Sequence, residues 1–171
     1  MAERAREHPD ARFIGLDPNH AGLIEMSRRL MRSRRAVNCH FVLGSVEELP
    51  GTFQELANSV TVLFPWGSLL RAVAAPVDED IERFAGLCAE GAAIDIVTAI
   101  DTEADKAELS RLGLAGFSVE RMADCWSRGF HVAAVEPLES DHEYQTTWWR
   151  KIRQRETRQA VRLSLRKPEQ P

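Results

Sequence analysis

Hydrophobic positions along the chain alternate between short apolar runs and longer segments with helical spacing. The short runs predict β-strands, at residues 11–17, 38–43, 58–64, 92–100, 130–138 and 159–165. The periodic segments predict α-helices, at residues 19–33, 66–75, 78–89, 118–128 and 143–155. Because strands that alternate with such helices form crossover units, we predict an α/β fold with a mainly parallel sheet and helices on both faces.

The composition indicates one domain. The chain has 171 residues, of which 44% are hydrophobic, and no internal repeat or linker divides residues 1–171. The three cysteines are widely separated and the five histidines show no ligand spacing, so we predict neither a disulfide framework nor a metal site. No stretch approaches the roughly 18 consecutive apolar residues that span a bilayer, and the amino terminus lacks an apolar signal region. We expect a cytoplasmic protein with no membrane partner.

Basic residues are concentrated in two segments of an otherwise acidic chain. The net charge is −4, but residues 150–167 carry eight basic side chains and one acidic one, and residues 28–35 carry five arginines and no acid. Each segment alone is typical of a solvated helix face. Two such segments favour a polyanionic partner, because neutralising phosphates releases counterions.

The residues that end the first three predicted strands are expected to share one edge of the sheet, where open α/β sheets bind their ligands. They are Asp17, the loop at 44–48 and the turn at 64–68. Asp17 either caps the helix that follows or accepts hydrogen bonds from a ribose diol. Glu47 either is a first-turn helix acid or belongs to a loop that walls an adenine.

A tryptophan lies on a predicted turn, in "LFPWGSLL" at residues 63–70. Trp66 is one of four tryptophans, and a turn offers the core little contact. It is either a core cap packed under a helix or a ring that stacks on a ligand. Its place after the strand-ending Pro65 favours the ligand. Trp126 lies on an amphipathic helix without such a context, and we expect it in the core.

Three motifs stand in a specific order: "FIGLDP", "LFPWGSLL" and a tryptophan before a basic carboxyl-terminal segment. On these motifs the chain, from residue 1 to about residue 165, resembles the aminoglycoside-resistance 16S rRNA (adenine-1408-N1)-methyltransferases. The resemblance implies the Rossmann-like fold of class I methyltransferases and S-adenosyl-L-methionine as cofactor. It implies N1 of an adenine in the decoding A site of 16S rRNA, within the 30S subunit, as the target. A complete enzyme would confer aminoglycoside resistance, and we expect a monomer.

The resemblance assigns roles to individual residues. Trp66 and Trp148 would stack on the two sides of the target base, although Trp149 also fits the second position. Phe64 and Pro65 belong to the same catalytic turn. The residues implied to bind the cofactor are Asp17, Ser45, Val46, Glu47, Leu63 and Ser68. The residues implied to bind RNA are Arg28, Arg29, Arg32, Arg150, Lys151, Arg153 and Arg158.

One family feature is missing from the sequence. Family members begin with a strand and a glycine-rich turn that presents backbone N–H groups to the cofactor, whereas this chain begins in what resembles the following helix and contains no GxG. We therefore expect a methyltransferase domain truncated at its amino terminus. The alternatives are a non-catalytic or vestigial RNA-binding domain and a methyltransferase that acts on another RNA. The basic segments disfavour a small-molecule substrate.

Overall fold

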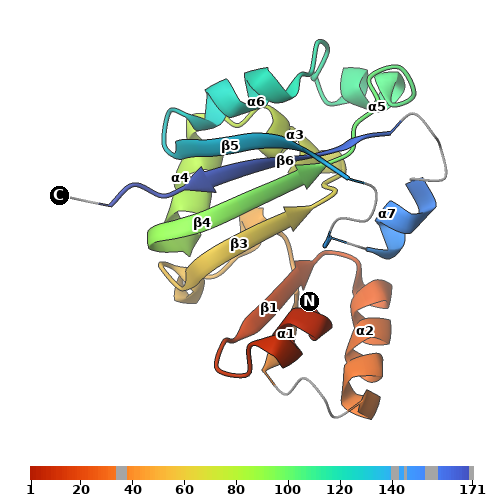
Figure 1. Cartoon of the computed structure of the whole chain (residues 1–171), viewed down its shortest axis with the longest axis vertical. Helices are drawn as coiled ribbons and strands as arrows, with labels where there is room; N and C mark the ends of the chain where they lie inside the picture. Colours follow the sequence, from red (N-terminus) through yellow and green to blue (C-terminus); the bar gives the residue numbers. More distant parts are fainter. Residues whose placement is uncertain (34–37, 140–142, 145, 153–157, 170–171) are drawn as a thin grey trace. The chain divides into compact units, whose positions relative to one another are not determined.

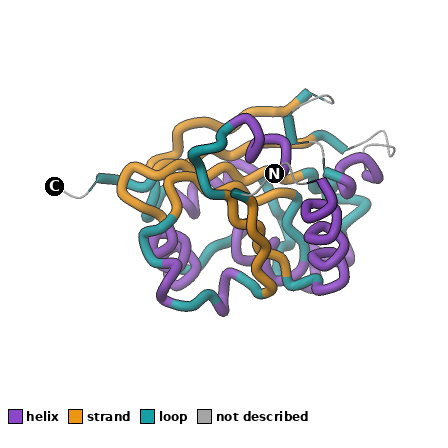
Figure 2. Tube along the Cα trace, turned by 90° about the horizontal axis from the view of Figure 1, so that it is seen from below, coloured by secondary structure: helices purple, strands orange, loops and turns teal. Residues whose placement is uncertain are grey.

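The computed structural model describes residues 1–33, 38–139, 143–144, 146–152 and 158–169. The chain divides into two compact units, Met1–Gly51 and Thr52–Pro171. Each unit has its own sheet, and Figures 1 and 2 show the helices and strands of both. The single domain that the composition indicates stays a prediction.

The first unit holds a two-stranded parallel sheet and two helices. Its elements are α1 (Ala2–Glu7), β1 (Phe13–Asp17), α2 (His20–Ser33), β2 (Cys39–Leu43) and the 3₁₀ turn η1 (Val46–Glu48); a second 3₁₀ turn, η2 (Gly51–Phe53), spans the sequence boundary between the units. The paired register runs from Phe13 opposite Cys39 to Asp17 opposite Leu43. Because the pairing is parallel, both strands end at the same edge.

Asn38 ties the start of β2 to the end of α1. Its side-chain amide donates to the carbonyl oxygens of Ala5, His8 and Ala11, at 2.9, 3.0 and 2.7 Å. Its own carbonyl accepts a hydrogen bond from the N–H of Phe13, at 2.8 Å. One side chain therefore satisfies carbonyls at the end of α1 and in the turn that leads into β1.

The second unit is built on a four-stranded sheet with the order β3-β4-β6-β5. Its strands are β3 (Ala57–Leu63), β4 (Cys88–Thr98), β5 (His131–Leu138) and β6 (Ala160–Arg166). β3 and β4 are parallel, whereas β6 is antiparallel to both β4 and β5. The last residue of β5, Leu138, pairs with the first residue of β6, Ala160, so the connection that contains α7 (Thr147–Ile152) begins and ends at one edge of the sheet.

Four further helices of the second unit are α3 (Gly67–Ala74), α4 (Asp78–Leu87), α5 (Lys106–Arg111) and α6 (Val119–Trp126). A tryptophan at the end of α6 is buried against residues of α3 and α4. α4 contacts β4, and α6 contacts β5, β6 and α3; Figure 1 shows α3 and α4 behind the sheet. Trp126 is fully buried, its ring lies 5.3 Å from Phe84 and 5.4 Å from Phe130, and its indole N–H donates to the carbonyl of Val73 at 2.9 Å. The prediction that Trp126 is a core residue is confirmed.

The two faces of β4 belong to different apolar layers. Ile94 and Ile96 are fully buried on one face, and the alternation of a strand puts Val97 on the other. Val97 joins a second apolar cluster, whose other members are Phe64, Ala99, Tyr144, Trp149 and Ala160. This second cluster lies at the carboxyl ends of β3 and β4, because Phe64 directly follows β3 and Ala99 directly follows β4.

The α/β fold is confirmed, with two differences from the sequence-based prediction. The four-stranded sheet is mixed rather than mainly parallel, because β6 inserts antiparallel between β4 and β5. α5 lies in a stretch for which the sequence predicted no helix. Leu109 is its one buried residue, so the segment has no repeated apolar spacing that would indicate a helix. Of the helices that the structure describes, none has the length and apolar character needed to cross a bilayer.

Candidate functional site

Asp17 is the last residue of β1, and its carboxylate is exposed. Its Oδ1 accepts a hydrogen bond from the N–H of Asn19 at 2.8 Å, and its other carboxylate oxygen accepts none from the described residues. The cap of α2 is instead Asn19, whose Oδ1 accepts from the N–H of Gly22 at 3.2 Å. Of the two interpretations of Asp17, the helix cap is therefore wrong. A free carboxylate oxygen at a strand end fits the acceptor that a ribose diol requires.

The loop after β2 lies beside Asp17 within the first unit. The N–H of Gly44 approaches the carbonyl of Asp17 at 3.4 Å, so the two strand ends are in contact. Ser45 and Val46 are half-buried and Glu47 is exposed in η1. Glu47 is thus a first-turn acid of a short 3₁₀ turn, which still leaves its loop free to border a ligand.

Two further residues predicted to bind the cofactor belong to the second unit. Leu63 ends β3 opposite Val97, and its side chain is 40% exposed. Ser68 is exposed in the first turn of α3. An exposed leucine at the end of a parallel strand offers an apolar wall at the edge where such sheets bind ligands.

Aromatic side chains meet beyond the carboxyl ends of β3 and β4. Phe64 follows β3, Trp66 precedes α3, and Trp148 lies on α7, which Figure 1 shows beyond the arrowheads of these strands. The ring centroids of Trp66 and Trp148 are 6.2 Å apart at an angle of 49°, and those of Phe64 and Trp148 are 5.6 Å apart. Trp66 is 43% exposed and Trp148 36% exposed, so neither indole is a core residue.

Burial distinguishes the two candidates for the second stacking position. Trp149 is 2% exposed and lies parallel to the Phe64 ring, at 5.4 Å and 4°. A ring enclosed in this way offers no face to a ligand. Trp148, like Trp66, is partly exposed to solvent. The geometry therefore favours Trp148 as the partner of Trp66.

The rings of Trp66 and Trp148 are closer together than a base sandwich requires. A flat ring between two others needs about 7–8 Å between the outer rings, which is twice the contact distance of about 3.5–4 Å. The observed separation of 6.2 Å and the tilt of 49° are too small and too inclined for an inserted base. A base therefore enters only when the two indoles move apart by about 1–2 Å and align.

The backbone of the turn requires its glycine. Gly67 has φ +61°, a conformation that other residues rarely adopt, and a Cβ at this position would meet open space. Pro65 is buried between Phe64 and the exposed Trp66. The glycine thus serves the shape of the turn that projects Trp66, rather than a tight contact.

A polar network lies on the same face of the sheet as the aromatic cluster. Ser164 donates to Asp95 at 2.6 Å, Tyr144 donates to Asp95 at 3.5 Å, and Arg162 donates to Tyr144 at 3.5 Å and to Glu136 at 2.5 Å. Burial raises the pKa of Tyr144 above its usual value, against the opposing effect of the Arg162 hydrogen bond. The phenol therefore stays a neutral hydrogen-bonding group over the physiological pH range.

Arginines of α2 form an exposed basic surface on the first unit. Arg28, Arg29 and Arg32 are all exposed, and Arg29 pairs with Glu25 one turn earlier. Arg28 and Arg32 lie on one side of the helix, since residues four apart are neighbours there. Their role as RNA contacts stays a prediction.

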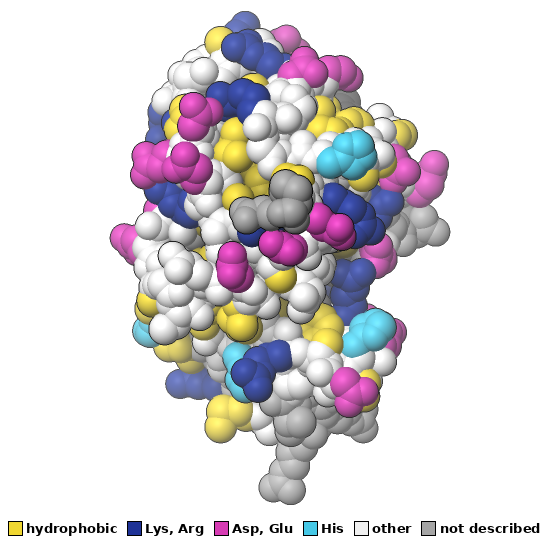
Figure 3. All heavy atoms as spheres, turned by 90° about the vertical axis from the view of Figure 1, so that its left-hand side faces the viewer, with side chains coloured by type: hydrophobic (Ala, Val, Ile, Leu, Met, Phe, Trp, Pro, Cys, Tyr) yellow, Lys and Arg dark blue, Asp and Glu magenta, His cyan; other side chains and the backbone are white. Residues whose placement is uncertain are grey.

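Basic residues also follow Trp148 on α7. Arg150 and Lys151 are exposed and follow Trp148 directly. Arg153 lies outside the described residues. On the face of the molecule that Figure 3 shows, Lys and Arg side chains are interspersed with Asp and Glu side chains rather than gathered together.

Arg158 occupies an interior position instead of a surface one. Its side chain is 4% exposed, and its guanidinium donates twice to the carboxylate of Asp105, at 2.6 Å each, and once to the carbonyl of Ala99, at 2.9 Å. The hydrogen bonds to Asp105 raise the pKa of Arg158, and burial opposes them. Its terminal nitrogens are engaged within the protein, so RNA contact by Arg158, which stays a prediction, requires the ion pair to open.

Sequence reasoning missed two residues that organise this region. Asp105 binds Arg158 and also accepts from the N–H of Asp101 at 3.1 Å, but an acid in a polar stretch carries no signal of burial. Tyr144 is the one tyrosine of the chain, and it joins the aromatic cluster to the polar network. Its rarity was the one available signal.

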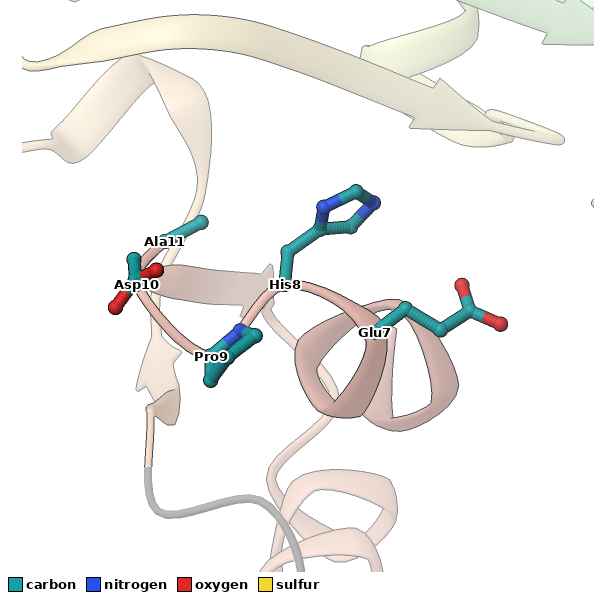
Figure 4. A pocket seen from close by; sticks show the side chains of 5 residues that line it. All are labelled: Glu7, His8, Pro9, Asp10 and Ala11. Atoms are coloured by element: carbon teal, nitrogen blue, oxygen red, sulfur yellow. The ribbon is translucent and has the colours of Figure 1, made fainter.

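A shallow hollow on the first unit lies at the turn after α1. It is lined by Glu7, His8, Pro9, Asp10 and Ala11. Figure 4 shows that the side chains of Glu7, His8 and Asp10 point in different directions. They do not converge on a common ligand position, and none of them was predicted to bind one.

A family model and a curated relative, both with the same description, match most of the chain. A family model described as 16S rRNA (adenine(1408)-N(1))-methyltransferase matches residues 1–166. A curated 16S rRNA (adenine(1408)-N(1))-methyltransferase of Escherichia coli is 28% identical over 151 residues, which cover 82% of this chain and 69% of that protein.

Solved structures agree with the fold. The aminoglycoside resistance methyltransferase NpmB1 is 27% identical with a TM-score of 0.74, over 97% of this chain and 80% of that chain. The 16S rRNA methyltransferase KamB has a TM-score of 0.82 at 22% identity, over 98% of this chain and 81% of that one. A mutant 16S rRNA (adenine(1408)-N(1))-methyltransferase from Catenulisporales acidiphilia, solved with its cosubstrate SAM, has a TM-score of 0.75 at 21% identity, over 99% and 82%. The last two show likeness of fold alone.

Proposed function

The chain belongs to the 16S rRNA (adenine(1408)-N(1))-methyltransferase family, and from that premise we propose that it methylates N1 of an adenine in the decoding A site of 16S rRNA. The substrate is the assembled 30S subunit in the cytoplasm, the acting species is a monomer, and the modification confers aminoglycoside resistance. The observation that carries the proposal is the half-exposed pair of Trp66 and Trp148, 6.2 Å apart at the carboxyl ends of parallel strands.

The aromatic pair suits a base that must leave its stack. N1 of a paired or stacked adenine is inaccessible, and extruding the base costs a few kcal/mol. Stacking on an aromatic side chain returns about 1–3 kcal/mol per base. Trp66 on one side and Trp148 on the other can therefore offset most of the cost of extrusion.

The reaction requires placement more than proton transfer. S-adenosylmethionine supplies, when bound, a methyl group attached to a positively charged sulfur. Neutral adenine N1 carries a lone pair and no proton, so the chain needs no general base. The positive charge passes to the methylated base, where the faces of Trp66 and Trp148 stabilise it through cation–π attraction. The remaining task of these side chains is to hold N1 in line with the methyl group.

Residues of the first unit fit the ribose and the adenine of the cofactor. The exposed carboxylate of Asp17, with one oxygen that no described residue occupies, would accept hydrogen bonds from the ribose. The loop of Ser45, Val46 and Glu47 beside it would border the adenine. Leu63, 40% exposed at the end of β3, is a further proposed cofactor contact.

The basic helices suit the rRNA backbone. Arg28 and Arg32 on α2 have no ion pair with a described residue, and Arg150 and Lys151 follow the stacking tryptophan directly. Exposed arginine side chains bind phosphates. Such contacts position the protein on the nucleic acid but do not distinguish one base sequence from another. Specificity for one adenine would then come from the shape of the A site and from access to the aromatic pair.

Calorimetry with S-adenosylmethionine tests the cofactor site. We expect one-to-one binding by the 171-residue chain and a weakening by about tenfold or more in Asp17→Ala, because losing hydrogen bonds to a charged acceptor costs about 1.5–3 kcal/mol. Asp10→Ala removes an exposed aspartate from the same unit and should leave the affinity unchanged. Absence of binding by the unaltered chain would contradict the cofactor proposal and favour a non-catalytic RNA-binding domain.

Primer extension tests the target. Purified 30S subunits incubated with the chain and S-adenosylmethionine should acquire a reverse-transcription stop at the A-site adenine, because methylation at N1 blocks its pairing edge. Reactions without S-adenosylmethionine should show no stop. Methyl transfer to free tRNA with none to 30S subunits would identify the chain as a methyltransferase of another RNA.

A further inference from the structure

The indole of Trp149 is an internal support next to the proposed base site. It is 2% exposed, and its ring lies flat on Phe64 at 5.4 Å and 4°. Phe64 is 7% exposed and also contacts the ring of Trp148, at 5.6 Å. One phenyl ring therefore touches both neighbouring tryptophans of α7, one buried and one facing solvent.

The start of α7 fixes which tryptophan is buried. Thr146 accepts a hydrogen bond from the N–H of Trp149 on its hydroxyl, at 2.9 Å, and one from the N–H of Arg150 on its carbonyl, at 3.1 Å. Successive residues of an α-helix are turned by about 100°. Packing Trp149 into the core therefore orients Trp148 away from it, toward Trp66.

Phe64 is itself held firmly by the sheet. Its φ is +49°, a conformation that costs a residue other than glycine about 1–3 kcal/mol, and its N–H donates to the carbonyl of Val97 at 2.7 Å. Trp66 follows two residues later on the same turn. Phe64 is thus linked to both members of the aromatic pair: it contacts Trp148 directly, and it lies on the same turn as Trp66.

We propose that Trp149 is a positioning residue for methyl transfer: its stack on Phe64 orients Trp148 toward Trp66, and its own ring does not contact the base. The inference rests on the proposed function. α7 has six residues, too few to be stable in water by itself. Its orientation therefore depends on buried contacts, among them the parallel Phe64–Trp149 stack.

Two substitutions of Trp149 distinguish a role of its flat ring from a role of its volume alone. Trp149→Leu keeps an apolar side chain without a face to stack, and Trp149→Phe keeps a face. Trp126→Phe alters a buried indole in the α3–α6 core instead and serves as the matched control. Each variant is made with and without Trp66→Phe, so that the circular-dichroism couplet of the Trp66–Trp148 pair is isolated as a difference.

We expect Trp149→Leu to lose this couplet and to lower kcat on 30S subunits by about tenfold or more, since a displacement of about 1 Å can cost 10²-fold. Its KM for 30S subunits and its affinity for S-adenosylmethionine should stay unchanged. Trp149→Phe should restore both couplet and kcat, and Trp126→Phe should retain both per folded molecule. If Trp149→Leu does not fold, Phe64→Leu removes the same stack from its other side.

An unchanged couplet and kcat in Trp149→Leu would overturn the inference. Equal losses in Trp149→Leu and Trp149→Phe would also overturn it, because they would indicate general loss of packing. Failure of the unaltered chain to methylate 30S subunits would contradict the proposed function instead. The couplet would still decide whether Trp149 orients Trp148 toward Trp66.

Discussion

Trp66→Ala is expected to lower methylation of 30S subunits by about 5- to 150-fold, because one base–aromatic stack is worth about 1–3 kcal/mol and 1.4 kcal/mol is a factor of ten. Trp66 contributes almost nothing to the core, with 43% of its surface exposed. The loss should therefore appear in kcat/KM for 30S subunits, while the unfolding midpoint and the affinity for S-adenosylmethionine stay unchanged. Timed primer extension over a range of subunit concentrations measures it.

Matched variants make this result specific to stacking. Leu56→Ala removes a 52% exposed hydrophobic side chain that directly precedes β3, whereas the aromatic turn follows β3, and this variant should methylate like the unaltered chain. Trp66→Phe keeps a smaller aromatic face, and its rate of methylation should lie between those of Trp66→Ala and Leu56→Ala. Full methylation by Trp66→Ala would refute the sandwich, because Trp148 alone would then suffice.

The order of elements was predictable because local sequence determines it. β1 ends at Asp17, which is followed by Pro18, as the sequence pattern predicted. α2 comes next, and Leu23 on its apolar side is buried. The direction of β6 was not predictable. It depends on where the connection after Leu138 leads, and no local pattern of β6 distinguishes a parallel neighbour from an antiparallel one.

The aromatic site was predictable in composition and not in detail. The position of Trp66 after Pro65 indicated an exposed ring, and the structure confirms it. The choice between Trp148 and Trp149 could not be made from sequence, because adjacent helical residues differ only in the direction they face. The partner of Trp149 is Phe64, more than eighty positions away in the printed sequence. Such a contact is visible only once the fold brings the two together.

The burial of Arg158 was also invisible to sequence reasoning, because a basic segment reads as a solvated surface. Arg158→Met is expected to destabilise the chain by about 3–5 kcal/mol, since it leaves the carboxylate of Asp105 buried without a counter-charge. The side chains of this pair are 4% and 6% exposed. Urea unfolding measures the loss. Arg111→Ala breaks the pair between the exposed Arg111 and Glu108 and should cost far less, because solvent screens that pair.

A double substitution shows whether the pair acts as a unit. Arg158→Met combined with Asp105→Asn removes both charges but keeps an amide oxygen that can accept from the N–H of Asp101. We expect the double variant to be more stable than Arg158→Met alone, because no uncompensated charge is left in the interior. Additive losses would mean that the two side chains contribute independently, contrary to their short bidentate contact.

The salt dependence of 30S binding then separates a structural role of Arg158 from an RNA contact. A side chain that neutralises one phosphate contributes about one unit to the slope of log K against log salt. Arg150→Ala, which changes an exposed residue beside Trp148, should reduce the slope by about one unit if α7 binds the backbone. Arg158→Met, studied at a temperature where it remains folded, should leave the slope unchanged because its guanidinium is held by Asp105 and Ala99. A slope reduced equally by Arg158→Met would show that this arginine leaves its ion pair to hold a phosphate of the rRNA.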